Sequence, residues 1–217
     1  MRLGRRAFVR DISIGALLGL APATAEGAPN TGGFSSKGIG EPWLRDLAAR
    51  HKQFFDVSAL NGGNPLRRAA SFLDIYHSSY GLSDGDVTVV FGAHSGGLAF
   101  ILGDRSWASF GLGRSLSVTD PASGNAAERN IFAGLDERAS SFAPSVKDLQ
   151  RRGVRFLACQ QSIIRLATQL ELTTQIPSSA IKDSLLADLL PGVTPVPAMI
   201  VATNRAQEAG LAYAYLG

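Results

Sequence analysis

Short apolar, β-branched runs that alternate with helical segments are the feature of this 217-residue chain that most limits its fold. The run 86–91 (DVTVVF) is continuous, which is typical of a strand buried on both faces of a sheet. The run 154–158 (VRFLA) has the same character. Alternating strands and helices favour a mainly parallel sheet with helices on both faces. The pattern therefore predicts an α/β fold without internal repeats, most simply five strands in flavodoxin-like order.

The other expected elements follow from periodicity and from Gly, Pro and Asn signals. Further strands are expected at 51–58, 199–202 and 212–216. Helices are expected within 42–50 and at 65–80 (capped by Asn64), 98–102, 144–152, 160–170, 178–189 and 204–210 (capped by Asn204). Loops are expected at 191–197 and at 104–142, the latter an irregular excursion over the site with a helix near 126–132.

The N-terminus carries an export signature. Residues 4–10 (GRRAFVR) match the twin-arginine pattern, apart from Gly4 where serine or threonine is usual. An apolar stretch at 12–20 and a small-residue cleavage site ending at Ala25 follow. The stretch is shorter than the ~20 residues of a spanning helix, so we expect no stable membrane anchor. We predict a signal peptide at 1–25, the twin-arginine translocase as partner during export, and a periplasmic or otherwise exported protein. A chance Arg-Arg on an ordinary secretory signal is the alternative.

After the signal, the sequence predicts a flexible linker and short helix over 26–50 and one α/β domain over 51–217. The formal net charge of +3 comes from the first segment, because residues 1–25 hold four of the 21 basic and one of the 18 acidic residues. The rest has equal numbers of each, and the basic footprint of a nucleic-acid-binding protein is missing. We therefore expect no nucleic-acid partner.

Three segments would follow strands at the carboxyl edge of a parallel sheet, where ligands bind in such folds. They are 58–64, 92–97 (GAHSGG) and Cys159. The N–H groups of the glycine-rich turn could bind an anion, and His94 could polarise a ligand or supply a proton. We therefore take Asn61, His94, Ser95 and Gly96 as candidate ligand-binding residues. A histidine that only caps the loop is an equal alternative.

Cys159 is the single cysteine, which excludes a disulfide within the chain and a multi-cysteine metal site. At a helix N-terminus, backbone N–H groups and the helix dipole would favour its thiolate, so Cys159 is the candidate catalytic residue. A small, inert core residue is the alternative. His51, His77 and His94 are too scattered to argue for zinc, so we predict no metal site. The sequence identifies no cofactor, although the twin-arginine route often carries proteins with one in place.

The segment 93–97 (AHSGG) also looks like a relaxed nucleophile elbow, A-x-S-x-G after a strand. In α/β-hydrolases the triad histidine follows the serine, and no histidine follows Ser95 in this chain. A triad in that chain order is therefore excluded. Without a strong enzyme motif, the sequence does not predict turnover.

Three segments resemble the DsrE/DsrF-like family. The segment 149–159 (LQRRGVRFLAC) is similar to the family signature L-x-x-x-G-V-x-F-x-x-C. The segment 87–95 resembles the second strand of the family and its histidine–glycine turn. The segment 209–215 (AGLAYAY) resembles the closing G-x-A-Y strand of the family. The resemblance spans 51–217 and implies a five-stranded parallel sheet that assembles as homotrimers or hexamers. In the sulfur-relay members, a cysteine at the position of Cys159 carries persulfide sulfur, so the resemblance implies a sulfur carrier. A non-catalytic binding module of the cell envelope, for a small ligand or cofactor, is the second hypothesis.

Overall fold

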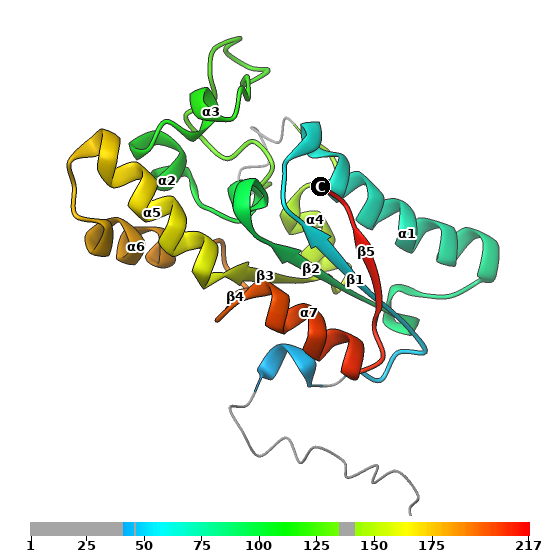
Figure 1. Cartoon of the computed structure of the whole chain (residues 1–217). Coiled ribbons are helices and arrows are strands. Elements are labelled where there is room, and N and C mark those ends of the chain that lie inside the picture. The colour runs from blue at the N-terminus through cyan, green and yellow to red at the C-terminus, as the bar shows by residue number, and fades with distance from the viewer. Residues whose placement is uncertain (1–40, 46, 135–141) are drawn as a thin grey trace, which may run out of the picture. The chain divides into compact units, whose positions relative to one another are not determined.

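The computed structural model of the chain describes residues 41–45, 47–134 and 142–217; the predicted signal peptide and the cleavage site at Ala25 lie outside these residues. Five parallel strands form one sheet in the order β4-β3-β2-β1-β5 (Figure 1). The strands are β1 (His51–Val57), β2 (Val87–Ala93), β3 (Arg155–Cys159), β4 (Val193–Val196) and β5 (Ala212–Tyr215). The predicted fold class is confirmed. Within that class, β1 lies between β2 and β5, whereas the order 2-1-3-4-5 would place it between β2 and β3.

Helices cover both faces of this sheet. The longer ones are α1 (Asn64–Tyr80), α5 (Gln160–Thr174), α6 (Ser178–Ala187) and α7 (Met199–Glu208). The shorter ones are η1 (Pro42–Leu44), η2 (Asn61–Gly63), η3 (Asp84–Asp86), η4 (Ser95–Phe100), α2 (Asp104–Ser109), α3 (Leu112–Ser115) and α4 (Val146–Arg151). Two short helices predicted from the sequence, within 42–50 and at 98–102, are thus the 3-10 turns η1 and η4.

The strand order decides which helices lie on which face. The chain moves one place along the sheet from β1 to β4, and right-handed crossovers then put the intervening helices on one face. The return from β4 to β5 runs over the other face and carries α7 alone (Figure 1). We call these the thick face and the α7 face.

Each face has its own hydrophobic core. The core of the thick face includes a run of large, fully buried side chains: Leu66, Phe91, Phe100, Trp107, Leu149 and Phe156. The core of the α7 face is smaller and has Phe54, Val90, Leu157, Met199, Ala202 and Ala206 at its centre. Most of the apolar burial that stabilises the domain therefore lies on the thick face.

The sequence prediction for β4 and α7 was wrong, because the loop expected at 191–197 contains a strand and the strand expected at 199–202 begins a helix. Proline is tolerated in an edge strand, and Pro195 lies exposed in β4 at one edge of the sheet. The apolar run 199–202 buries Met199 and Ala202 on the sheet but leaves Ile200 81% exposed. This is helical spacing, and Asn204 lies inside the helix rather than capping it.

The start of α1 also differs from the sequence prediction. Asn64 is already helical, and the residue before the helix is Gly63 with φ +81°, so Asn64 is not a side-chain cap. Pro65 does lie in the first turn, and Gly81 ends the helix in a left-handed conformation as expected.

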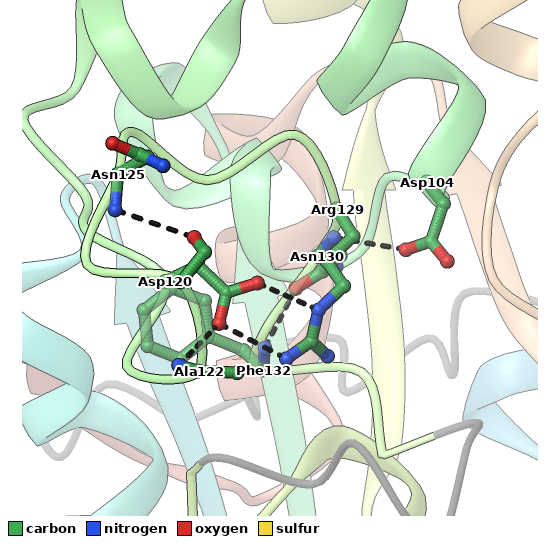
Figure 2. Close-up of polar contacts among 8 residues, drawn as sticks. Asp104, Asp120, Ala122, Asn125, Arg129, Asn130 and Phe132 are labelled. Carbon is green, nitrogen blue, oxygen red and sulfur yellow. Dashed lines mark hydrogen bonds and ion pairs between the residues drawn. The ribbon is translucent and has the colours of Figure 1, made fainter.

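The segment 104–142 is only partly irregular. It forms α2 and α3 and then a bridge between Thr119 and Ala126, and the helix expected near 126–132 is not formed. Asp120 instead pairs with Arg129, with Nε to Oδ2 at 2.8 Å (Figure 2). Asn130 Oδ1 accepts the Phe132 N–H at 2.9 Å, and side-chain-to-backbone bonds of this kind compete with helix formation, which explains why the helical expectation failed.

Buried Asn130 joins this segment to the residues at and just after the end of η4. Its Nδ2 lies 3.2, 2.9 and 2.7 Å from the carbonyl oxygens of Ala99, Phe100 and Leu102. Its backbone N–H donates to Asp104 Oδ1 at 2.8 Å. Asn130 thus supplies a side-chain donor to the carbonyls of Phe100 and Leu102 inside the thick-face core, whereas Ala99 O also accepts the Trp107 Nε1–H.

Candidate functional site at the carboxyl edge of the sheet

Two cavities open above the carboxyl ends of the strands. The first, of about 450 Å³, is lined by the turn after β1, including Asn61, and by 116–119. The second, of about 540 Å³, is lined by Ser95, by 110–116 and by one side of α5. Gly96 lines both. Three of the four candidate ligand-binding residues predicted from the sequence, Asn61, Ser95 and Gly96, therefore lie at cavity walls.

Strained backbone gathers around these cavities. Four non-glycine residues of the described chain have positive φ: Asn61 (42°), Ser95 (48°), Ser117 (54°) and Gln175 (59°). The first three line the cavities, whereas Gln175 is the C-cap of α5. Such conformations cost free energy and persist where the surrounding structure holds them, which is common at functional sites.

A tight turn sets the position of His94 and Ser95. The His94 N–H donates to Val57 O at 3.0 Å, which continues the pairing of β1 and β2 beyond the strands. A Cβ at Gly97 would lie 2.3 Å from Val57 O, so only glycine lets the start of η4 pack this closely on β1. The glycines after His94 therefore fix where the turn lies.

His94 belongs to a polar cluster with Asp56 and Tyr213. His94 Nε2 lies 2.9 Å from Asp56 Oδ1, and Tyr213 Oη donates to Asp56 Oδ2 at 2.8 Å. The His94 and Asp56 side chains are 23% and 15% exposed. The His94 contact is close but poorly aligned, because Asp56 Oδ1 has no well-aligned hydrogen bond among the described residues. The contact is an ion pair when the imidazole is protonated.

The cluster shifts the pKa values of two of its members, Asp56 and Tyr213. Burial raises the pKa of Asp56, but the close contact with His94, the hydrogen bond from Tyr213 and the nearby His94 charge outweigh this and hold it below its ordinary value. Burial, the hydrogen bond to Asp56 and the Asp56 charge raise the pKa of Tyr213 to about 12. Asp56 is thus an ionised acceptor and Tyr213 a neutral donor near neutral pH.

Strand register explains why these groups meet. Phe54 belongs to the α7-face core, and side chains alternate along a strand, so Asp56 points to the same face. Asp56 is paired with Gly92 on β2 and with Tyr215 on β5. A second contact joins β1 to β5 above it, with Ser58 Oγ and Tyr215 Oη 2.6 Å apart.

Cys159 lies apart from the cavities. It is 4% exposed and belongs to the α7-face core, at the end of β3 and just before α5. Its Sγ accepts the N–H of Met199 at 3.3 Å. The structure therefore places the sulfur beneath the first turn of α7, on the same face of the sheet as Asp56.

Over the described ranges, no group of three or more histidine, cysteine, aspartate or glutamate side chains could hold a metal ion. Within the same ranges, no helix is long and apolar enough to cross a membrane.

Three residues of this site, Asp56, Tyr213 and Tyr215, were not predicted from the sequence. Asp56 is a lone carboxylate in the apolar strand context FFDV, and the tyrosines of the AYAY strand are spaced to face one side. Both signals were present, but their meaning depends on β5 lying beside β1. A contact 157 residues apart is not visible in local periodicity.

Comparisons with known proteins give a distant neighbour and no relative. No family model matches the chain, and no curated protein matches it. A solved structure of a protein of unknown function, MTH1491 from Methanobacterium thermoautotrophicum, is 16% identical with a TM-score of 0.40, and the match covers 76% of this chain and 99% of that chain.

Proposed function

We propose that the protein binds a small organic molecule at the carboxyl edge of its sheet, with Asn61, His94, Ser95 and Gly96 as contacting residues. The observation that carries this proposal is the clustering of three positive-φ residues around two adjoining cavities. His94, which contacts Asp56, lines neither cavity but directly precedes Ser95, which lines the second. Strained backbone costs stability and is common at ligand and active sites. A carboxylate whose pKa is shifted by specific partners is also common at such sites.

The lining favours a ligand with an apolar body and one anionic or polar group. Leu116, Ile131 and Phe132 are among the apolar residues around the first cavity. Arg165 is an exposed residue at the wall of the second cavity, and it forms no ion pair with another described residue. Apolar walls with a few fixed polar groups are typical of small-molecule sites.

Thermal unfolding with added butanoate, octanoate or sulfate tests this proposal. We expect one of the carboxylates to raise the Tm in a concentration-dependent way, because binding to the folded state alone stabilises it. His94→Ala should lose the shift, whereas His77→Ala, on the exposed surface of α1, should keep it. If no probe shifts the Tm, or if the shift survives in His94→Ala, the proposal fails.

A persulfide carrier is the second candidate, with Cys159 as the acceptor. The observation that favours it is the Met199 N–H pointing at Sγ at 3.3 Å, since a backbone donor stabilises an anionic sulfur. Its burial means that the first turn of α7 must move for the thiol to react. Incubation with a persulfide donor should add about one sulfur atom (~32 Da) to the intact mass, as expected for an accessible thiolate, and Cys159→Ser should abolish the gain. A thiol that reacts only after denaturation would rule this candidate out.

The proposal also includes export of the protein and its assembly into a homo-oligomer. The GRRAFVR motif supports export by the twin-arginine route to the periplasm, and the DsrE/DsrF-like resemblance supports a homotrimer or hexamer. Replacing Arg5 and Arg6 by lysine should leave the precursor in the cytoplasm, as seen by cell fractionation. Light scattering of the mature protein measures the assembly, and a monomer would contradict that part of the proposal.

A further inference from the structure

A line of three contacting side chains runs through His94. Asp56 Oδ1 lies 2.9 Å from Nε2 of the imidazole, and Ser95 Oγ lies 3.2 Å from Nδ1 on its other side. In the tautomer that carries its proton on Nε2, that N–H lies close to the carboxylate, although not in line with it, and Nδ1 is left to accept the Ser95 hydroxyl proton. A carboxylate, an imidazole and a hydroxyl in this sequence are the parts of a general-base-activated nucleophile.

The three side chains follow a different chain order from the triad of α/β-hydrolases. No histidine follows Ser95, but none is needed in the order Asp56, His94, Ser95, because there the base precedes the nucleophile. Such constellations are recognised by geometry and role, since unrelated folds hold them in different chain orders.

Ser95 also has the placement that a nucleophile needs. It is exposed, it has φ +48°, and it is the first residue of η4, which follows β2 after His94. It lines the cavity of about 540 Å³, whose apolar side chains are Phe110, Leu112, Leu116, Leu166 and Leu170. A reacting hydroxyl at the wall of an apolar cavity fits a substrate with a hydrocarbon part next to the bond that is cleaved.

Tyr213 acts through Asp56. Its hydroxyl donates to Oδ2 at 2.8 Å, which leaves Oδ1 turned to His94. Tyr213 is therefore a positioning residue that fixes the carboxylate and touches no reacting atom.

We propose that Ser95, His94 and Asp56 hydrolyse small carboxylic esters or thioesters whose acyl group lies in the cavity beside α5. This inference rests on the ligand site proposed above and names its substrate class. Ser95 Oγ attacks the acyl carbon while His94 Nδ1 takes the hydroxyl proton. The tetrahedral intermediate then expels the alcohol or thiol, which leaves with that proton, and an acyl ester remains on Ser95. Water, deprotonated by His94, attacks this ester and releases the carboxylic acid, and the proton returns to Ser95 Oγ.

Two measurements on the purified mature protein test the inference. The first is hydrolysis of p-nitrophenyl acetate, butanoate and octanoate. The second is peptide mapping after treatment with phenylmethylsulfonyl fluoride, which labels activated serines. We expect the longer esters to be cleaved with a higher kcat/KM than acetate, and the label to lie on Ser95.

Ser95→Gly is the decisive variant, because glycine adopts the positive φ without strain and the domain should remain folded. It should lose the label and at least ~100-fold in kcat/KM, the usual contribution of a positioned base and its nucleophile. Tyr213→Phe should lower kcat with little change in KM. Ser79→Ala, at the exposed end of α1, is the matched control and should change neither.

The outcomes separate this inference from the ligand site. Label or hydrolysis that persists in Ser95→Gly would overturn it, as would their absence from the unmodified protein. If hydrolysis is absent while octanoate still raises the Tm and His94→Ala removes that shift, the binding site stands and only the hydrolysis is refuted. If octanoate and the other probes also leave the Tm unchanged, both proposals fail.

Discussion

The two faces of the sheet share five strands but are covered to different depths. The thick face carries several helices and an aromatic core that includes Phe91, Phe100 and Trp107. The α7 face carries one ten-residue helix and η1, and beyond them it exposes Tyr213 and Tyr215 at 43% and 57%. The buried sulfur and the Asp56–His94 pair both lie on this thinner side. One well-filled face can thus supply stability while the other retains groups that a core would exclude.

The largest expected loss of stability comes from a substitution in the core of the thick face. Phe91 is fully buried and contacts the rings of Phe100 and Phe156 at centroid distances of 5.8 and 4.9 Å. Phe91→Ala should cost about 3–5 kcal/mol in the free energy of unfolding, because it leaves a cavity in a rigid core. Urea denaturation measures this. A cost below about 1 kcal/mol would show that the thick face is not the main source of stability.

Asn130→Ala should be the next largest, at about 3 kcal/mol, because it strips several buried backbone groups of their partner. Asn125, exposed in the same segment, is the matched control, and Asn125→Ala should stay within about 0.5 kcal/mol. The same urea titration compares the two variants. Equal costs would mean that the Asn130 contacts carry no special weight.

Met199→Ala tests the α7 face. Because a single helix covers this face, α7 can shift toward the sheet and reduce the cavity that the smaller side chain leaves. We expect a cost of about 2 kcal/mol, at the low end for a buried methionine. We also expect faster reaction of Cys159 with a thiol reagent under native conditions, because Met199 and Cys159 belong to the same small core and the variant loosens its packing. Phe91→Ala serves as the comparison. If both variants raise the thiol reactivity equally, opening is global and the two faces do not differ in this respect.

The smallest expected effect is the contribution of Asp56 to the pH dependence of folding stability. The folded pKa lies below the ordinary 3.8, so the unfolded chain binds a proton first as the pH falls. The stabilisation is therefore present above pH ~4 and is lost as the pH falls through the folded pKa. The Tm of Asp56→Asn should lie below that of the unmodified protein at pH 7, and the gap should narrow toward pH 3. A gap that does not change with pH would show that the charge of Asp56 contributes nothing.

Local patterns predicted the fold class because the central strands β2 and β3 are continuous apolar runs and Gly81 marks a helix end. They failed where tertiary contacts override local preference. Pro195 looks like a loop residue but is tolerated at a sheet edge. The run 199–202 is β-branched in part but lies on the sheet with helical spacing.

The candidate site was half predictable for a similar reason. Asn61, Ser95 and Gly96 follow strands, and the rule that ligands bind beyond the carboxyl ends of strands is enough to choose them. Asp56 and Tyr213 are functional candidates only because β5 lies beside β1, which depends on the whole topology. The burial of Cys159 depends likewise on α7, which the sequence analysis had placed as a strand.

The pairing of β1 with β5 has a consequence for biosynthesis. The contacts of Tyr213 with Asp56 and of Tyr215 with Ser58 each join residues 157 positions apart. While a ribosome still holds the last strand, β1 to β4 can already assemble the thick-face core, but Asp56 has no tyrosine to bind. Contacts so distant in the chain form late, because a long loop must close first. The polar cluster is therefore completed only when the last strand has joined the sheet, so a signal from this cluster would distinguish a finished domain from a nascent one.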